Sequence, residues 1–210
     1  MPGHPEPART PEPPQVYVVD DERQISNLVR RLLERAGYRV ATFLSPVEFL
    51  EQADLTEPTC VLLDMNMPEM TGLDVQQRLK GYEPPPRIVF VSGGASVPHS
   101  VQAMKAGAVD FLEKPFQSGT LLSAVADALA QSKRDFAAQQ KRTAARERLQ
   151  KLTPREREVI EAVVRGLRSK QIAEELGAAE KTVNIHRSNA MRKLEVETVA
   201  RLIALMSEAR

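Results

Sequence analysis

Three aspartates, a serine and a lysine, far apart along the chain, have side chains that together could bind a metal ion and an anion. Carboxylates that lie close together repel each other, and one takes up a proton unless a cation neutralises the group. An all-oxygen set with few ligands suits Mg²⁺, which keeps several waters and often shares its ligands with a phosphate. A lysine ammonium and a serine hydroxyl could hold that phosphate. The five residues are Asp20, Asp21, Asp64, Ser92 and Lys114.

Short apolar runs typical of buried strands precede these side chains. Asp20, Asp64 and Ser92 end three of the runs, and Lys114 follows a fourth. Because the runs are continuously apolar rather than alternating, we expect a parallel sheet that is covered by helices on both sides. Ligands bind beyond the carboxyl ends of the strands in such a sheet, so the five side chains should meet at one rim. The predicted strands are VYVVD (16–20), RVATF (39–43), CVLLD (60–64), RIVFVS (87–92) and AVDFL (108–112).

Helical patterns separate these strands, so residues 15–131 are predicted to form an α/β domain with a doubly wound, five-stranded parallel sheet. The first helix is predicted from apolar residues at i, i+3, i+4, i+7 and i+8. Cys60, the chain's single cysteine, lies within an apolar strand and is interpreted as a buried side chain rather than a reactive thiol. The stripe of the first helix consists of Ile25, Leu28, Val29, Leu32 and Leu33.

Composition and charge narrow the classes of protein. The chain is 42% hydrophobic and 27% charged, and no apolar run approaches the ~20 residues that cross a membrane. Residues 1–14 contain six prolines and are predicted to form a disordered arm. Residues 1–130 hold 11 Lys and Arg against 17 Asp and Glu, whereas residues 131–210 hold 18 against 11. This asymmetry indicates that the second half contacts a polyanion.

Residues 150–210 are predicted to form an all-α domain of four helices, joined to the first domain by a helical linker over 132–149. The linker contains no Gly or Pro and consists mostly of strong helix formers. Thr153 and Glu156 have the spacing of a capping box. The stretches SKQIAEEL, Gly177 and AEKTVNIHRSNAMRKL indicate a helix, a tight turn and a longer helix, the order of a helix-turn-helix motif.

The longer helix of this motif should have one packed face and one polar face. The polar face combines amide, hydroxyl and basic groups with one apolar side chain, which suits a DNA major groove. Asn can pair with adenine, Ile can contact a thymine methyl, and Arg can bind guanine or phosphate. The polar face comprises Lys181, Asn184, Ile185, Ser188 and Arg192, and the packed face comprises Val183, His186, Arg187, Ala190 and Leu194.

The first half resembles the receiver domain of two-component response regulators, with a flavodoxin-like fold. The motifs are VVDDE, LLDMNMPEMTG, VSGGAS and EKPF, within residues 15–131. The resemblance implies that Asp64 is the phosphoacceptor and takes its phosphoryl group from a phosphohistidine on a sensor histidine kinase. It further implies that Asp20, Asp21 and Asp64 bind Mg²⁺ together with the main-chain carbonyl of Asn66.

The same resemblance assigns roles around the phosphoacceptor. Lys114 pairs with phosphoryl oxygens, Ser92 is the switch hydroxyl, and Phe111 is the aromatic residue whose rotamer responds to phosphorylation. The peptide bond between Lys114 and Pro115 is expected to be cis. Receivers of this family pair through the face of the helix and strand within SVQAMKAGAVDF, so Val101 and Lys105 are candidate contacts of a phosphorylation-dependent homodimer.

Residues 150–208 resemble the LuxR-type DNA-binding domain, through LTPREREV, GLRSKQIAEEL and KTVNIHRSNAMRKL. With the receiver, the chain resembles response regulators of the FixJ/NarL family. Asn184 and Ser188 stand where the family commonly has basic residues, so the operator cannot be transferred from relatives. His186 is either a DNA contact or a packed side chain. The resemblance places Asn184, Ile185 and Ser188 at bases, and Lys170, Thr182, His186, Arg187 and Lys193 near the DNA backbone.

The leading hypothesis is a transcription factor of the bacterial cytoplasm that is switched by phosphorylation, binds promoter DNA as a dimer, and has RNA polymerase as a further possible partner. An aspartate-nucleophile phosphatase is a second hypothesis, but it would need a substrate-binding insertion. An unphosphorylated interaction module is a third, which an intact phosphorylation site disfavours. We therefore expect no enzyme activity beyond slow self-dephosphorylation.

Overall fold

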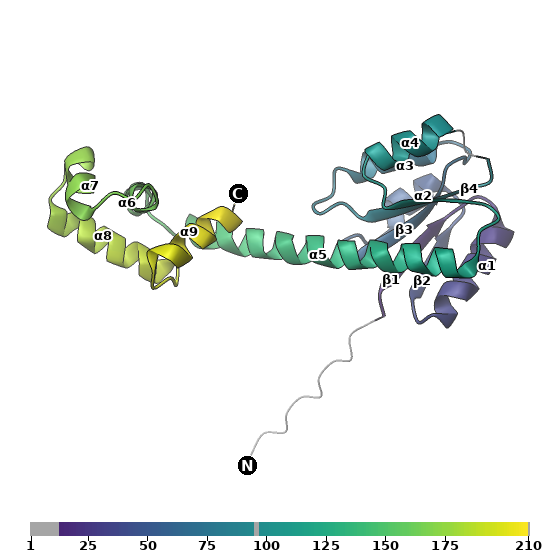
Figure 1. Ribbon diagram of the computed structural model, residues 1–210, viewed down its shortest axis with the longest axis horizontal. Helices are drawn as coiled ribbons and strands as arrows, with labels where there is room; N and C mark the ends of the chain where they lie inside the picture. Colours follow the sequence, from purple (N-terminus) through teal and green to yellow (C-terminus); the bar gives the residue numbers. More distant parts are fainter. Residues whose placement is uncertain (1–12, 95–96, 210) are drawn as a thin grey trace, which may run out of the picture. The chain divides into compact units, whose positions relative to one another are not determined.

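The computed structural model describes residues 13–94 and 97–209, so the predicted arm over residues 1–14 lies almost wholly outside the described residues. The chain divides into two compact units (Figure 1). The division falls between Phe136 and Ala137, inside helix α5 (Ser118–Gln150). The predicted linker, residues 132–149, lies wholly within this helix.

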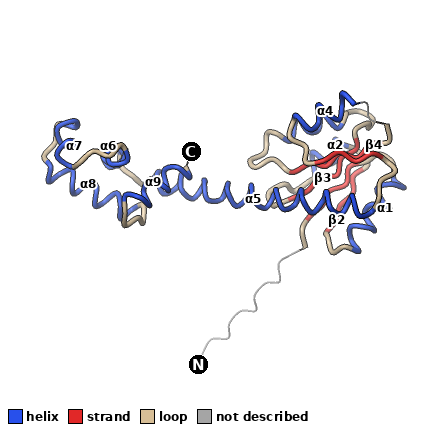
Figure 2. Tube along the Cα trace, viewed as in Figure 1, coloured by secondary structure: helices blue, strands red, loops and turns tan. Residues whose placement is uncertain are grey.

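Among the described residues of the first unit, five strands form one parallel sheet, as predicted (Figure 2). The order β2-β1-β3-β4-β5 places β1 and β3 side by side in its centre. The last strand begins two residues later than expected, because its ladder with β4 starts at the pair Val89 and Asp110. The strands are β1 (Gln15–Val19), β2 (Arg39–Phe43), β3 (Thr59–Asp64), β4 (Arg87–Ser92) and β5 (Asp110–Glu113).

Helices cover both faces of this sheet, which explains the continuously apolar strands. In β1, Tyr17 and Val19 point into a core shared with α2, α3 and α4, whereas Val16 and Val18 point into a core shared with α1 and α5. Cys60 is buried in the second core, and burial raises the pKa of its thiol. It is therefore a buried, unreactive side chain, as the sequence indicated. The helices are α1 (Arg23–Arg35), α2 (Pro46–Gln52), α3 (Gly72–Leu79) and α4 (Val97–Lys105).

One residue of the predicted stripe on α1 does not pack. Val29 and Leu33 are buried, whereas Leu28 is 69% exposed. Helix α1 meets the sheet over a narrower strip than the sequence pattern implies, so a residue one position from Val29 falls on the rim of that strip. There Leu28 borders a groove of about 400 Å³ that Phe116 and Arg35 also line.

Polar contacts attach α5 to the end of the sheet at which β3 and β4 begin. The Ser132 hydroxyl, fully buried, accepts a hydrogen bond from the Thr59 backbone N–H at 2.9 Å. The Nε and Nη2 atoms of Arg87 each lie 2.6 Å from Oδ2 of Asp135. Both contacts lie at the amino-terminal ends of β3 and β4, so they do not compete with the rim where the aspartates lie.

Replacing Ser132 by Ala is expected to lower the free energy of unfolding by about 1–3 kcal/mol, because the buried Thr59 N–H would lose its acceptor. Urea-induced unfolding of the purified chain measures this change. Ser123→Ala is the matched control, since Ser123 is exposed on the same helix. Identical unfolding midpoints for Ser132→Ala and wild type would contradict the assigned hydrogen bond.

The described part of the second unit is entirely helical. Helices α6 (Pro154–Val164), α7 (Ser169–Leu176), α8 (Glu180–Lys193) and α9 (Val199–Glu208) enclose one core. Ala145 and Leu149 of α5 pack in that core. Thr153 caps α6 in the predicted capping box with Glu156. Gly177 ends α7 with φ 60°, a left-handed conformation that favours glycine and makes the tight turn before α8.

Candidate metal centre and nucleic-acid interface

The three predicted aspartates meet at the carboxyl edge of the sheet. One carboxylate oxygen from each of Asp20, Asp21 and Asp64 lies within 4.8 Å of the other two. The parallel register pairs Val19 of β1 with Leu63 of β3, so the residues that follow these two necessarily lie side by side. Asp20 and Asp64 are buried, whereas Asp21 is exposed. The cluster is therefore an all-oxygen group, open to solvent on one side, that could bind a metal ion.

Lys114 reaches the same cluster from the end of β5. Its Nζ atom lies 2.7 Å from Asp20 Oδ2 and 3.8 Å from Asp64 Oδ1. Its backbone N–H donates to the Ser92 carbonyl at 2.8 Å, which joins the ends of β4 and β5. The bond between Lys114 and Pro115 is cis, as expected. A cation is thus placed beside the two buried carboxylates.

Burial dominates the electrostatics of Asp64. Desolvation raises the pKa of Asp64 to about 6, the charge of Lys114 opposes this rise, and the charge of Asp20 adds to it. Burial alone would lower the pKa of Lys114, but its hydrogen bond to Asp20 and the charges of Asp64 and Asp20 outweigh that effect and raise it. A second cation among the carboxylates would favour the ionised form of Asp64.

The remaining predicted residues of this site lie at or near the same rim. Ser92 is buried at the end of β4, and its hydroxyl accepts a hydrogen bond from the Gly94 N–H at 3.5 Å. Asn66 is exposed two residues after Asp64. Phe111 is half-buried and stacks on Phe90, with ring centroids 6.2 Å apart and planes inclined by 24°. Of the predicted dimer contacts on α4, Val101 is 45% exposed and Lys105 is also exposed.

Two residues of this site were not predicted from the sequence. The Glu22 carboxylate accepts a hydrogen bond from Lys114 Nζ at 3.3 Å, and its place directly after the aspartate pair was the available signal. Gly72 begins α3 against the back of the site. A Cβ atom on Gly72 would lie 2.4 Å from the Asp64 carbonyl oxygen, and no local pattern reveals that approach.

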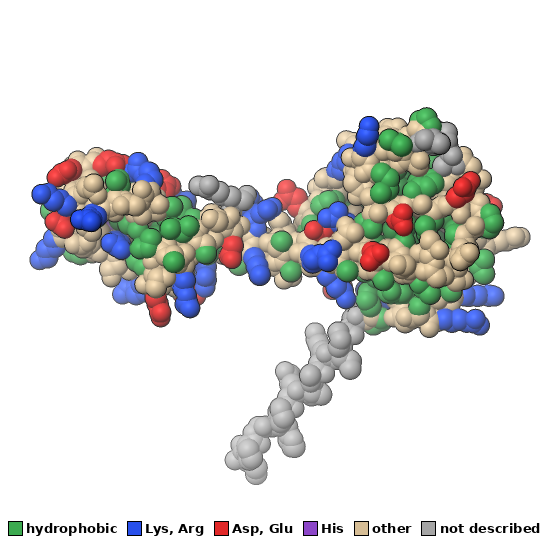
Figure 3. Space-filling model, viewed as in Figure 1, with side chains coloured by type: hydrophobic (Ala, Val, Ile, Leu, Met, Phe, Trp, Pro, Cys, Tyr) green, Lys and Arg blue, Asp and Glu red, His purple; other side chains and the backbone are tan. Residues whose placement is uncertain are grey.

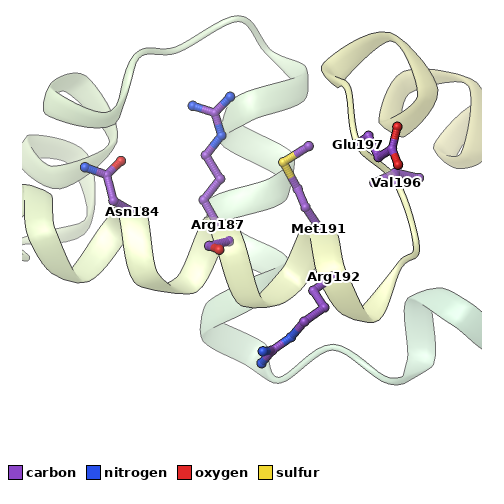
Figure 4. Close-up of a pocket in the computed structure, with 7 residues that line it drawn as sticks. Asn184, Arg187, Met191, Arg192, Val196 and Glu197 are labelled. Carbon is purple, nitrogen blue, oxygen red and sulfur yellow. The ribbon is translucent and has the colours of Figure 1, made fainter.

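In the second unit, α8 has the two faces that the sequence predicted. Val183, Ala190 and Leu194 are buried, and His186 and Arg187 are half-buried, so His186 packs at least in part. The opposite face is exposed, with Ile185 at 52%. Figure 4 shows Arg187 and Arg192 pointing in opposite directions from α8, around a hollow of about 520 Å³. Its lining residues are Asn184, Arg187, Ser188, Met191, Arg192, Val196 and Glu197.

Three of the predicted DNA contacts already have side-chain partners within the second unit, and one of them is Arg192, whose Nη2 donates to Asn189 Oδ1 at 3.2 Å. Lys193 Nζ lies 2.7 Å from Glu156 Oε2. Asn184 Oδ1 accepts a hydrogen bond from the Ser169 hydroxyl at 2.6 Å. Lys170, Lys181 and Thr182 are exposed. Lys and Arg side chains lie among Asp and Glu side chains on the visible surface of this unit (Figure 3).

Each of the two units matches a known protein family. Residues 16–126 match the family described as response regulator receiver domain, and residues 150–206 match the luxR family of bacterial regulatory proteins. The chain is 39% identical to the response regulator protein TodT of Pseudomonas putida over 193 residues, which are 90% of this chain and 83% of TodT. It is a response regulator of the FixJ/NarL type.

Other regulators are similar over nearly the whole chain. The transcriptional regulatory protein FixJ of Bradyrhizobium diazoefficiens is 33% identical over 92% of this chain and 95% of its own. The solved structure of the response regulator StyR has a TM-score of 0.83 and 39% identity, covering 93% of this chain and 99% of StyR. Full-length FixJ from B. japonicum has a TM-score of 0.57 and 33% identity, covering 93% and 97% of the two chains.

This response regulator is therefore a two-component transcriptional regulator. Its receiver domain implies a sensor kinase as partner, and its luxR-type domain implies DNA binding. Regulators with these two domains are typically not enzymes. None of the described helices combines the length and hydrophobicity that a membrane span requires.

The ion pair between Glu156 of α6 and Lys193 of α8 should make the stability of this regulator depend on pH. The hydrogen bond from Lys193 is the main reason that the pKa of Glu156 is lowered. A carboxylate whose pKa is lower in the folded state stabilises that state above its unfolded pKa, about 4.3, and loses this contribution as the pH falls through the folded pKa. Glu156→Gln is expected to have a lower thermal midpoint than wild type at pH 7. Below pH 4 the two thermal midpoints should lie closer together.

The control for this prediction is Glu158→Gln, because Glu158 is an exposed glutamate on the same helix. Its ion pair with Arg155 lies at the surface and should contribute little at either pH. Scanning calorimetry of the full chain separates the transitions. A constant difference between wild type and Glu156→Gln from pH 7 to pH 3.5 would contradict the assignment.

Proposed function

We propose that Asp64 accepts the phosphoryl group in this regulator. The observation that carries the proposal is the meeting of Asp20, Asp21 and Asp64 within 4.8 Å, with Lys114 Nζ 3.8 Å from Asp64. An Asp64 carboxylate oxygen attacks the phosphorus of a phosphohistidine on the kinase, and the phosphorus–nitrogen bond breaks as the histidine nitrogen leaves. The product is an acyl phosphate on Asp64, whose slow hydrolysis resets the protein.

The donor set fits Mg²⁺. Asp20, Asp21 and Asp64 would hold the ion together with the main-chain carbonyl of Asn66, and the bound ion would neutralise charge on the transferring group. Lys114 binds and orients phosphoryl oxygens from the opposite side. Ser92, whose hydroxyl now accepts from the Gly94 N–H, turns to bond the phosphate.

The phosphate signal passes from this rim to the face of α4 and β5. Ser92 leaves its present position when it bonds the phosphate, and the half-buried Phe111 turns inward behind it. The α4 face then changes, and two copies pair through a surface that includes Val101 and Lys105. The exposed apolar side chains of Val101 and Met104 support this choice of face.

In the bacterial cytoplasm, the dimer binds promoter DNA through the domain over residues 150–210. The helix over 132–149 joins this domain to the receiver over 15–131. Asn184, Ile185 and Ser188 contact bases. Two-fold symmetry sets the half-sites about one DNA turn, ~34 Å, apart. RNA polymerase is the partner through which the bound dimer acts. The residues proposed at the DNA backbone are Lys170, Lys181, Thr182, His186, Arg187, Arg192 and Lys193.

Beryllofluoride, a phosphoryl mimic, tests the proposal without a kinase. With Mg²⁺ it should raise the thermal midpoint of the receiver transition, convert the chain to a dimer in sedimentation experiments, and increase retention of promoter DNA. EDTA should reverse all three effects. Val101→Asp should bind beryllofluoride normally but stay monomeric. Failure of beryllofluoride to bind in the presence of Mg²⁺ would refute the proposed site.

A further inference from the structure

Three carboxylates surround the ammonium group of Lys114. Its Nζ atom lies 2.7 Å from Asp20 Oδ2, 3.3 Å from Glu22 Oε1 and 3.8 Å from Asp64 Oδ1. The first two contacts are hydrogen bonds, whereas the third is an ion pair beyond hydrogen-bond distance. The cation is therefore held closer to Asp20 and Glu22 than to Asp64, the proposed phosphoacceptor.

The main chain of Glu22 is held in place without help from its side chain. Its N–H donates to Asp20 Oδ1 at 2.9 Å, and its carbonyl accepts the Ser26 N–H at 3.0 Å at the start of α1. Glu22 is the N-cap residue of this helix, but its side chain makes no capping hydrogen bond. The contact between the Glu22 carboxylate and Lys114 is therefore a feature of the site and not a requirement of the helix.

This contact opposes the binding of an anion at Asp64. Glu22 and an incoming phosphoryl group attract the same cation and repel each other. Asp20 would share its carboxylate with Mg²⁺, which weakens its hold on Lys114. Among the described residues, the carboxylates that meet within 4.8 Å are those of Asp20, Asp21 and Asp64, so Glu22 lies beside the metal cluster and not in it. Glu22 then remains as a restraint on Lys114 when the metal is bound.

We propose that Glu22 is a positioning residue of the phosphorylation site: its carboxylate competes with the incoming phosphoryl group for Lys114. This inference rests on the proposed function, in which Asp64 accepts the phosphoryl group and Lys114 binds its oxygens. The competition makes Glu22 a brake on occupation of the site by anions. Because the Glu22 side chain is 59% exposed and that of Lys114 is 10% exposed, water screens the contact in part and limits the size of the effect.

Separate titrations of the full-length protein with the metal and with the phosphoryl mimic test this role. Glu22→Gln removes the charge but keeps the size of the side chain and the N–H that Asp20 accepts. At saturating Mg²⁺ it should bind beryllofluoride about twofold to fivefold more tightly than wild type, the range for one partly exposed charge pair. It should bind Mg²⁺ alone more weakly, because a nearby negative charge is lost. Fluorine NMR and calorimetry measure the two affinities.

Two further variants separate the contact from the charge alone. Glu22→Asp keeps the charge, but a shorter side chain at the N-cap favours a capping bond to its own helix over Lys114. It should bind beryllofluoride more tightly than wild type and bind Mg²⁺ with the wild-type affinity. Glu34→Gln makes the same change of charge at an exposed residue about 18 Å further along α1, beyond the screening length in physiological salt. It should match wild type for both ligands.

A purely structural role of Glu22 would give a different result, because a distorted site binds both ligands more weakly. A beryllofluoride affinity of Glu22→Gln that equals or falls below that of wild type would overturn the inference. A wild-type beryllofluoride affinity of Glu22→Asp would also overturn it, since the charge would then act without the contact to Lys114. Either result leaves the proposed function in place. Failure of the wild type to bind beryllofluoride with Mg²⁺ would overturn both.

Discussion

Replacing Asp64 by Asn is expected to abolish phosphoryl uptake from acetyl phosphate, lowering the rate by more than about a thousandfold, as removal of the nucleophile does in enzymes that use one. The amide has nearly the same shape as the carboxylate, but it has no ionised oxygen to attack phosphorus. Asp64 is the appropriate target because Lys114 lies 3.8 Å from it and Asp20 and Asp21 converge on it. Intact-protein mass spectrometry measures the added phosphoryl group directly.

Asp127→Asn is the matched control, because Asp127 is exposed on α5 and the substitution is chemically identical. It should be phosphorylated at the wild-type rate. Undiminished uptake by Asp64→Asn would mean that another residue is the acceptor. Labelling of Asp20 in the variant would also count against the proposal, since Asp20 is assigned to metal binding.

Replacing Gly72 by Ala is expected to damage both stability and phosphoryl uptake. The added Cβ would lie 2.4 Å from the Asp64 carbonyl oxygen, 2.8 Å from Phe90 Cε1 and 3.2 Å from Met65 Cα. Two of these neighbours are backbone atoms, so no side-chain rotation relieves the overlap. Overpacking of this kind typically costs about 1–3 kcal/mol. A loss of that size lowers the thermal midpoint by several degrees, roughly 4–8 °C per kcal/mol for a small domain.

Gly119→Ala is the control for this prediction, because a Cβ on Gly119 meets no atom within 4 Å. Gly119 lies in helix α5, where alanine is the better helix former, so this variant should be as stable as wild type or slightly more stable. Calorimetry and acetyl phosphate labelling of both variants provide the test. A Gly72→Ala protein with wild-type stability and phosphoryl uptake would contradict the prediction, because it would show that the backbone at the end of β3 can shift to accommodate the added Cβ.

Local patterns were sufficient to predict the elements and most of the candidate site. A strand that is buried on both faces must be continuously apolar, so the five runs identified the parallel sheet. The ends of neighbouring parallel strands coincide, so Asp20, Asp64 and Lys114 could be placed together from their positions in those runs. The helical period likewise separated Val183 and Ala190 from Ile185 and Ser188, because the spacing of side chains around a helix is constant.

Only the tertiary structure decided contacts between elements, because these depend on distances that no local period encodes. The width of the contact between α1 and the sheet left Leu28 exposed. The approach of α3 to β3 made Gly72 essential to the shape of the site. The packing of α7 on α8 placed the Ser169 hydroxyl 2.6 Å from Asn184 Oδ1, a contact that the periodicity of neither helix reveals.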